Sequence, residues 1–332
     1  MNVKELIRTI NHTLKSHNLF PENSRILVAC SGGPDSMALL YLLQDIATHR
    51  HTTYKIGVAI VDHCIRPESK DEVLWLQHQV EELGLPFYSA SFDVPRLSKE
   101  YKKSEETIGR QVRYQWLNEI AQSEGYDYIS VAHHKDDQAE SILAHIIRGS
   151  GLNGLTGMSV VQSEYAIPVV RPLLDVTKED LLAYIGTKHI SYCVDSTNDD
   201  VRYQRNRIRH RIIPELEAVN PAVVDAIVRL GSSVNEDVMV ISDLTARTFD
   251  KLVAIGKDEV RISRRAFRQE PLAIQRRLWQ HLVSTIDPEL MLTSAHQEQL
   301  LDIVNTGEKK TFTIKSIKVI AQCDTIKVYC KH

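Results

Sequence analysis

The sequence has no long hydrophobic run. No stretch of its 332 residues approaches the ~20 consecutive apolar residues that a membrane helix requires. Its start, MNVKELIRTINHTLKSHNLF, alternates apolar with polar residues, where a signal peptide would carry an uninterrupted apolar region. These absences argue against membrane-spanning and secreted proteins, and we expect a cytoplasmic protein with no membrane partner.

Cysteine is scarce, and its spacing indicates no pairing. The five residues are an odd number and form no CxxC pattern, which indicates neither a disulfide framework nor a zinc ribbon. We expect most of them to be small buried hydrophobic residues. They are Cys30, Cys64, Cys193, Cys323 and Cys330.

An excess of positive charge is also lacking. The formal net charge of −3 argues against generic coating of nucleic acid, because such binding draws on many contacts from Lys and Arg to phosphate. Two segments depart from this average. Arg202–Arg211 (RYQRNRIRHR) holds five arginines and no acid, and Arg261–Gln280 holds six arginines against one Glu.

The length and composition indicate two folded domains. The chain is 43% hydrophobic and 25% charged, near the average of soluble globular proteins. Since a domain typically has roughly 100–200 residues, 332 residues suit two of them. We predict a first domain over residues 1–217 and a smaller domain over 218–332, with the boundary near Ala218.

The first domain has the pattern of an α/β fold. Short apolar runs alternate with longer amphipathic stretches, which predicts repeated βα units and a parallel sheet. The predicted strands are Arg25–Cys30, Tyr54–Asp62, Pro86–Phe92 and Tyr126–Ala132. The predicted helices are Asp35–Ala47, Glu68–Leu83, Glu105–Glu124 and Asp136–Arg148.

The rest of the chain predicts a linker helix and a small α+β domain. The segment GSGLNGLTGM is rich enough in glycine to predict a functional loop without regular structure. A helical stretch from about Arg205 to Leu230, interrupted by Pro214 and by Asn220-Pro221, links the two domains. Beyond it we expect helix to about Thr285 and then short antiparallel strands, in a domain that binds and does not react.

The loop SGGPDS carries the clearest chemistry. It joins a strand to a helix N-terminus, so its backbone N–H groups and the helix dipole favour a phosphate. No Walker A lysine follows the glycines, and Asp35 can face phosphates only through Mg²⁺. The alternative is a glycine turn capped by Asp and Ser. The predicted ATP-binding residues of the loop are Ser31, Gly32, Gly33, Pro34, Asp35 and Ser36.

The segment AHHKDDQAE follows the fourth predicted strand and opens a helix. This places His133, His134, Asp136 and Asp137 at the carboxyl edge of the sheet, where ligands of open α/β sheets bind. A capped helix with solvated histidines and a zinc site are the alternatives, but no cysteine lies nearby in the sequence. The carboxylate pair favours a role in holding Mg²⁺ and pyrophosphate.

Two further segments place polar groups near the expected nucleotide. Asp62 ends the second strand and could meet a ribose hydroxyl, with His63 and Arg66 beside the nucleotide, unless it is an ordinary cap. Arg110 and Arg113 lie three residues apart on one helix face. They suit either phosphate contact or a surface row of ion pairs.

The loop resembles the signature SGGxDS of the PP-loop ATP pyrophosphatases. Within that superfamily, six further blocks resemble the tRNA(Ile)-lysidine synthetase family and cover most of the first 210 residues in the family's order. The blocks are IVDHCIRPES, EETIGRQVRY, AHHKDDQAES, RGSGLNGLTGM, RPLL, and DSTN with YQRNRIR. Lys178 stands where the motif after RPLL commonly has Arg.

The resemblance implies a PP-loop domain, similar to adenine nucleotide alpha hydrolases, that uses ATP and Mg²⁺. It implies adenylylation of the C2 oxygen of the wobble cytidine in an isoleucine tRNA with a CAU anticodon. Free lysine then displaces AMP, which gives lysidine with AMP and pyrophosphate as the other products. The resemblance also implies a short form that lacks the additional domain of longer members.

The resemblance also implies roles for individual residues. Asp35 and Asp137 are assigned to Mg²⁺ and pyrophosphate, and His133 with Arg110 or Arg113 to charge in the transition state. The arginine-rich segment is expected to face the tRNA or the mouth of the site, although such a helix is more often a solvated face. The residues expected to bind substrate or tRNA are His134, Asp136, Glu140, Arg148, Arg171, Asp195, Asn198, Arg205, Asn206 and Arg209.

Two other functions stay open at this point. A PP-loop tRNA thiolase would need reactive cysteines, and an expected position of Cys30 or Cys64 near the loop leaves this option open. A non-catalytic tRNA-binding or nucleotide-sensing module is opposed by the acidic groups at the loop. The residues that hold lysine and the oligomeric state, with a homodimer as one option, are not determined by the sequence.

Overall fold

The fold comes from a computed structural model that describes residues 1–66, 68–193, 204–256, 259–288, 290–306 and 309–330. The chain divides into two compact units, Met1–Ser232 and Ser233–His332. This division falls inside helix α11 (Val223–Leu252), whereas the sequence placed a boundary near Ala218. Although α11 has 30 residues, neither it nor any other described helix is long and apolar enough to cross a membrane.

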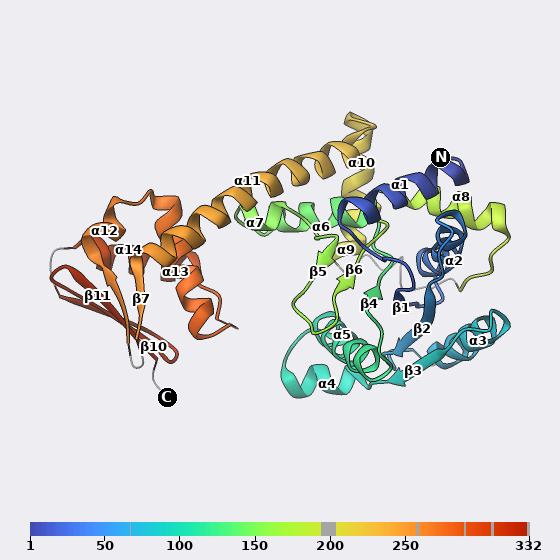
Figure 1. The fold of residues 1–332 in the computed structure, drawn as a ribbon, viewed down its shortest axis with the longest axis horizontal. Coiled ribbons are helices and arrows are strands. Elements are labelled where there is room, and N and C mark those ends of the chain that lie inside the picture. The colour runs from blue at the N-terminus through green and yellow to red at the C-terminus, as the bar shows by residue number, and fades with distance from the viewer. Residues whose placement is uncertain (67, 194–203, 257–258, 289, 307–308, 331–332) are drawn as a thin grey trace. The chain divides into compact units, whose positions relative to one another are not determined.

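The first unit is built on a six-stranded sheet with the order β3-β2-β1-β4-β6-β5 (Figure 1). Paired strands run parallel, except that β5 is antiparallel to β6. The predicted α/β class is therefore confirmed. The strands are β1 (Arg25–Ala29), β2 (Lys55–Asp62), β3 (Phe87–Ser91), β4 (Tyr128–Ser130), β5 (Val161–Gln162) and β6 (Val169–Val170).

Helices surround this sheet, and most of them follow a strand in the chain. They are α1 (Val3–Ser16), α2 (Pro34–His49), α3 (Ser69–Glu82), α4 (Val94–Tyr101), α5 (Glu105–Ser123), α6 (Lys135–Ile147), α7 (Leu152–Leu155), α8 (Lys178–Lys188), α9 (Gln204–Arg207) and α10 (Ile213–Val219). A π-helical turn, Ile208–Ile212, joins α9 to α10.

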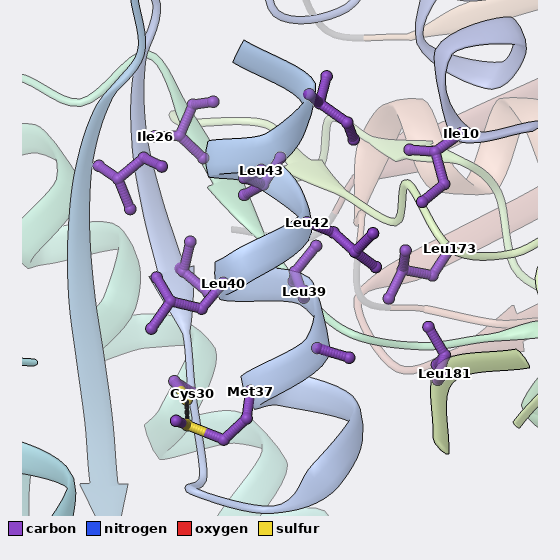
Figure 2. Packing of buried hydrophobic residues seen from close by; sticks show 14 of the residues in the cluster. Ile10, Ile26, Cys30, Met37, Leu39, Leu40, Leu42, Leu43, Leu173 and Leu181 are labelled. Atoms are coloured by element: carbon purple, nitrogen blue, oxygen red, sulfur yellow. Dashed lines mark hydrogen bonds between the residues drawn. The ribbon is translucent and has the colours of Figure 1, made fainter. Parts of the chain in front are cut away.

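The two faces of the sheet are covered by different helices. Alternate residues of a strand point to opposite faces, so Ile26 of β1 packs in the core with α2, whereas Leu27 packs in the core with α5. Helix α2 is buried around most of its circumference, and Figure 2 shows Leu42 of α2 near Ile10 of α1. This buried position fixes the loop at the N-terminus of α2.

The four predicted strands and four predicted helices are found within two residues at each end. The sequence analysis did not predict helices α1, α4 and α8 or the strands β6 and β5 at one side of the sheet. Pro214 does not interrupt the helical path as predicted, because it lies in the first turn of α10, where a missing N–H has little cost.

The glycine-rich segment after α6, predicted to lack regular structure, contains the helical turn α7. The Gly154 N–H donates to the Gly151 carbonyl at 2.9 Å, within this turn. Gly149 and Gly157 each have a φ of +71°, which glycine adopts far more readily than other residues, and they lie on either side of the turn. The glycines thus bound the turn and do not prevent it.

The second unit is a smaller α+β structure, as predicted. Its antiparallel sheet has the order β7-β8-β11-β10-β9. The prediction of helix to about Thr285 is wrong, since β7 and β8 precede α12; their β-branched residues pack on the core that surrounds Trp279. The elements are β7 (Val253–Ile255), β8 (Val260–Ser263), α12 (Arg264–Gln269), α13 (Leu272–Ile286), α14 (Ser294–Asn305), β9 (Lys310–Ile314), β10 (Ile317–Gln322) and β11 (Thr325–Cys330).

The arginines of this unit do not form one free basic face. Arg264 is 3% exposed and donates to the carbonyls of Ile303, Val304 and Cys323 at 2.8 to 3.2 Å. Arg268 also donates to the Val304 carbonyl, at 2.6 Å. Both side chains therefore satisfy carbonyls at the carboxyl end of α14, which have no partner within the helix.

We predict that Arg264→Met destabilises the second unit by about 3 kcal/mol, because it leaves buried carbonyls without donors. Urea unfolding of the intact chain measures this change. Arg265→Met is the matched control, since Arg265 is the exposed neighbour, and it should change stability by less than about 0.5 kcal/mol. Equal effects of the two substitutions would contradict a capping role for Arg264.

Candidate active site at the carboxyl edge of the sheet

The loop between β1 and α2 is ordered by its own serines. The Ser36 hydroxyl donates to the Gly33 carbonyl at 2.9 Å and accepts from the Ser31 N–H at 3.2 Å. Gly32 has a φ of +78°, and Pro34 occupies the first turn of α2. The predicted phosphate loop therefore has the expected form, with backbone N–H groups at a helix N-terminus.

Asp35 in the first turn of α2 is paired with a lysine that the sequence analysis did not assign to the site. Lys178 Nζ lies 2.7 and 2.6 Å from the two carboxylate oxygens of Asp35. The Lys178 N–H donates to Asp136 Oδ2 at 2.8 Å, which fixes the start of α8 beside α6. Lys178 thus contacts both Asp35 of the loop and Asp136 of the segment after β4.

The histidine and aspartates after β4 form the second acidic group. His134 is 3% exposed, and its Nε2 lies 3.8 Å from Asp35 Oδ2 and 3.4 Å from Asp137 Oδ2. Burial alone would lower the pKa of His134, but its contacts with Asp136, Asp137 and Asp35 raise it above its ordinary value. His134 therefore holds a proton more readily than an ordinary histidine and joins the loop to α6, as expected if both segments serve one ligand.

Two arginines hold the buried acids of α6. Arg205 lies 2.8 Å from Asp137 and 2.9 Å from Glu140, and Arg209 lies 3.0 Å from Asp137 and 2.6 Å from Glu140. Burial would raise the pKa of Asp137, but His134 and Arg205 hold it at about 2. The arginine-rich segment contains no acid of its own, and its ion-pair partners lie about 65 residues earlier in the chain.

His133 lies in a cationic and water-poor environment. Burial, together with Arg171, Arg205 and Arg113, lowers the pKa of His133 to about 3, although Asp137 opposes the shift. Its Nδ1 is buried without a hydrogen-bond partner among the described residues. A neutral ring of this kind can donate or accept a hydrogen bond at neutral pH, but it does not supply positive charge.

An aromatic pair lies beside these arginines. The rings of Tyr114 and Tyr165 stack with centroids 5.6 Å apart, and the guanidinium groups of Arg110 and Arg113 lie over the Tyr114 ring at 4.8 and 5.5 Å. Arg171 is 2% exposed and donates to the Ser159 carbonyl at 2.9 Å. Arg171 also interacts with Tyr114, so the structure brings Arg110, Arg113 and Arg171 together. No feature of the sequence pattern indicated Tyr165.

The segment after β2 is held by local bonds. Asp62 accepts from the Cys64 N–H at 2.8 Å, and Arg66 lies 3.1 Å from Glu72. Burial and Arg113 lower the pKa of His63 to about 4, so this ring is neutral. These contacts are those of a capped strand end, and a ribose contact from Asp62 stays a prediction.

Other predicted site residues are distributed differently. Arg148 is exposed at the far end of α6, about 16 Å from Asp137 along a helix that rises 1.5 Å per residue. Asn206 lies on α9, half-buried, between the two paired arginines. Asp195 and Asn198 lie outside the described residues.

The described cysteines differ from the sequence-based expectation. Only Cys30 is buried among the four whose environment the structure describes; Cys193 is half-buried, and Cys64 and Cys323 are exposed. Burial raises the pKa of Cys30, Cys64 and Cys193 above the ordinary value of a thiol. The prediction that most cysteines are buried is therefore wrong.

The carboxylates suit a magnesium ion with bound phosphates better than a metal centre made by protein alone. Among the described residues no group of three or more His, Cys, Asp or Glu side chains could hold a metal ion. Mg²⁺ commonly binds one or two carboxylates together with substrate phosphates and water. The Asp35 side chain is 27% exposed and that of Asp137 is 9% exposed, so Asp35 is the more accessible of the two carboxylates.

Comparison with known proteins agrees with this geometry. Residues 3–216 match the family model described as the PP-loop domain, an ATP-binding family, and the chain belongs to this family. In a U34-tRNA thiolase from Methanococcus maripaludis the same fold is present, with a TM-score of 0.59 and 20% sequence identity over 70% of this chain and 78% of that chain. At this identity the likeness concerns the fold alone.

Curated relatives narrow the resemblance to one enzyme name. The chain is 35% identical over 226 residues to a tRNA(Ile)-lysidine synthase of Porphyromonas gingivalis, a match that covers 68% of this chain and 48% of the relative. It is 37% identical over 246 residues to a protein of the same name from Thermosipho africanus, which covers 74% and 56%. The chain thus spans about half the length of these relatives.

We predict that Lys178→Ala weakens ATP binding roughly tenfold, because it removes a cation whose hydrogen bonds to charged groups are worth about 1.5–3 kcal/mol. Isothermal titration with ATP and Mg²⁺ measures the loss. Lys178→Arg keeps the charge and should bind ATP nearly as tightly as the unmodified protein. Lys188→Ala is the control, because Lys188 lies on the same helix as Lys178 and forms an ion pair with Asp45 of α2, away from the loop. Unchanged affinity in Lys178→Ala would show that Lys178 serves only to neutralise Asp35.

The lowered pKa of His133 predicts a dependence of stability on pH. Between pH 6.5 and about 3 the unfolded chain binds a proton at this residue that the folded protein does not bind, so the free energy of unfolding falls as the pH falls. His133→Gln should make this slope shallower in urea unfolding measured at several pH values. His17→Gln, at an exposed histidine, is the control. A slope that His133→Gln leaves unaltered would contradict a neutral buried ring.

Proposed function

We propose that this chain is a tRNA(Ile)-lysidine synthase, which uses ATP to join free lysine to C2 of the wobble cytidine in the CAU-anticodon isoleucine tRNA. One observation carries the proposal: the carboxylate of the phosphate loop and the histidine–aspartate group after β4 meet through His134. The name shared by the curated relatives supports the choice of substrate.

ATP binds with its phosphates at the N-terminus of α2. The loop N–H groups and the helix dipole stabilise the β and γ phosphates, which leave together as pyrophosphate. Asp35 would hold Mg²⁺ there, and this ion neutralises charge on the phosphates when bound. Lys178 then loses its partner Asp35 and becomes available to a phosphate oxygen.

Adenylylation makes the cytosine oxygen a leaving group. The C2 oxygen attacks the α-phosphate, the bond from the α-phosphate to the bridging oxygen of pyrophosphate breaks, and pyrophosphate departs. The lysine amine then attacks C2, and AMP departs with the oxygen. Arg113 provides positive charge for the phosphate, and neutral His133 contributes a hydrogen bond, not a charge.

The cytosine must leave its stack to reach the sheet edge, as enzymes that act on bases generally require. Tyr165, which is partly exposed and stacks on the buried ring of Tyr114, offers an aromatic surface of the type on which unstacked bases rest. Arg205 and Arg209 are engaged by Asp137 and Glu140, so their role is to shape the site from within.

A PP-loop tRNA thiolase is less well supported. Such an enzyme needs reactive thiolates, and reactive cysteines have a lowered pKa. Burial raises the pKa of Cys30 and of Cys193, whose N–H donates to the Gly32 carbonyl of the loop at 2.8 Å. Burial and acidic neighbours raise the pKa of Cys64. Adenylylation followed by attack of an amine requires no thiol.

The proposed activity is tested by incubating the protein with ATP, Mg²⁺, labelled lysine and the CAU-anticodon isoleucine tRNA. Label should enter this tRNA and not elongator methionine tRNA. Asp35→Asn should lower the rate by about 100-fold, because it removes a group that stabilises charge at the phosphates. Asp71→Asn changes an exposed carboxylate in the same unit and should keep full activity.

Two results would each contradict one part of the proposal, either the substrate or the role of Asp35. The absence of label from the isoleucine tRNA with the unmodified protein would overturn the assigned substrate. Normal activity of Asp35→Asn would leave the reaction in place but remove Asp35 from the machinery. The thiolase alternative would instead give sulfur incorporation and no lysine.

A further inference from the structure

A hollow on the first unit lies away from the candidate active site. It has a volume of about 440 Å³ and is formed by α1 and the carboxyl end of α2. Figure 2 shows α1 residue Ile10 near α2 residue Leu42, consistent with the packing of these helices in one core. The residues that line the hollow are Arg8, Asn11, His12, Lys15, His49 and Arg50.

The lining is basic and contains no carboxylate. Arg8, His12 and Lys15 are exposed and lie four and three residues apart, so they share one face of α1. No ion pair joins any of the three to an acid in the part of the chain that the structure describes. This differs from Arg205 and Arg209, whose charges are neutralised inside the protein.

Asn11 provides a second, independent observation. It is 8% exposed, it lines the hollow, and its Oδ1 is buried without a hydrogen-bond partner among the described residues. Buried polar atoms are normally hydrogen-bonded, so the free acceptor of Asn11 can receive a hydrogen bond from a ligand in the hollow once the side-chain amide turns toward it. A simple inorganic anion satisfies the cations but supplies no suitable donor when fully ionised.

The backbone of RNA matches both features. Its phosphates carry the negative charge that the cations attract, and its ribose 2′-hydroxyl can donate to a buried acceptor. The hollow lies at the opposite end of α2 from the phosphate loop, about 24 Å away for a helix of 16 residues. A contact there would bind a part of the RNA distant from the reacting base.

We propose that this hollow binds the ribose–phosphate backbone of the RNA substrate, with the cations on phosphate and Asn11 on a 2′-hydroxyl. This inference rests on the proposed function, because it takes the bound RNA to be the tRNA that this chain modifies. It adds a binding site that contributes affinity but not base recognition, because backbone contacts carry no sequence information directly.

The first test measures binding of the CAU-anticodon isoleucine tRNA to the full chain at several salt concentrations. Arg8→Gln with Lys15→Gln should weaken binding about tenfold and reduce the slope of log K against log salt by about 1.5, since two phosphate contacts are lost. The KM for tRNA should rise with kcat unchanged. Lys99→Gln with Lys103→Gln removes two exposed cations on and after α4 and should leave affinity and slope as they were.

The second test separates the acceptor from the charges. Asn11→Leu should weaken tRNA binding several-fold without changing the salt slope, while the unfolding midpoint of the protein stays the same or rises. Inorganic tripolyphosphate serves as the competing probe for a free anion. If the Arg8/Lys15 or Asn11 variants bind tripolyphosphate more weakly but bind tRNA normally, the hollow binds a free anion and the RNA assignment is wrong. If these variants bind both tripolyphosphate and tRNA normally, the hollow is not a binding site.

These outcomes are distinct from failure of the proposed function. Lysine labelling by the unmodified protein tests the reaction, whereas the salt slope tests the hollow whether or not lysine is incorporated. If the unmodified protein incorporates lysine but the Arg8/Lys15 variant binds tRNA normally, the proposed function holds and the hollow does not bind the tRNA.

Discussion

The pairing of two buried acids with two arginines is the interaction on which the rest of the site depends. Asp137 and Glu140 are 7% and 1% exposed, and charges so far removed from water persist only when they are paired and hydrogen-bonded. Arg205 and Arg209 each contact both acids, so α6 is joined to the segment that follows residue 203 by four ion pairs. Loss of one partner of a buried pair typically costs about 3–5 kcal/mol of stability. Here it would also detach the segment that carries Arg205 and Arg209 from α6.

Burial and the charged groups around this pairing shift the pKa values of two neighbouring histidines in opposite directions. His134 faces Asp35, Asp136 and Asp137, which raise its pKa against the effect of burial. Burial, together with Arg171, Arg205 and Arg113, lowers the pKa of the adjacent His133 to about 3. His133 is therefore neutral at neutral pH, whereas His134 holds its proton more tightly than an ordinary histidine. Asp35, held by Lys178 and more exposed than Asp137, is the carboxylate that can exchange its partner when phosphates and a cation arrive.

Local sequence patterns were sufficient for the elements that carry the site but not for the contacts between them. The apolar runs predicted β1 to β4, and the glycines before Asp35 predicted the loop, because these features depend on neighbours in the chain. The partners of Asp35, Glu140 and Arg264 lie 143, 65 and about 40 residues away, and no periodicity encodes such distances. The strands β7 and β8 were missed because short β-branched runs between helices give the same pattern as part of a helix.

The uses of arginine show why a count of charges in a sequence segment is a poor guide to RNA binding. Arg205 and Arg209 lie in the segment with the highest density of arginine, yet their charges are matched inside the protein by Asp137 and Glu140. Arg264 and Arg268 satisfy the carbonyls that end α14. Arg8 and Lys15 belong to an unremarkable stretch of the sequence, but they line a hollow without acids. Since an interior partner cancels the field that attracts a polyanion, the cations that bind RNA are those that the fold leaves unmatched, and only the tertiary structure identifies them.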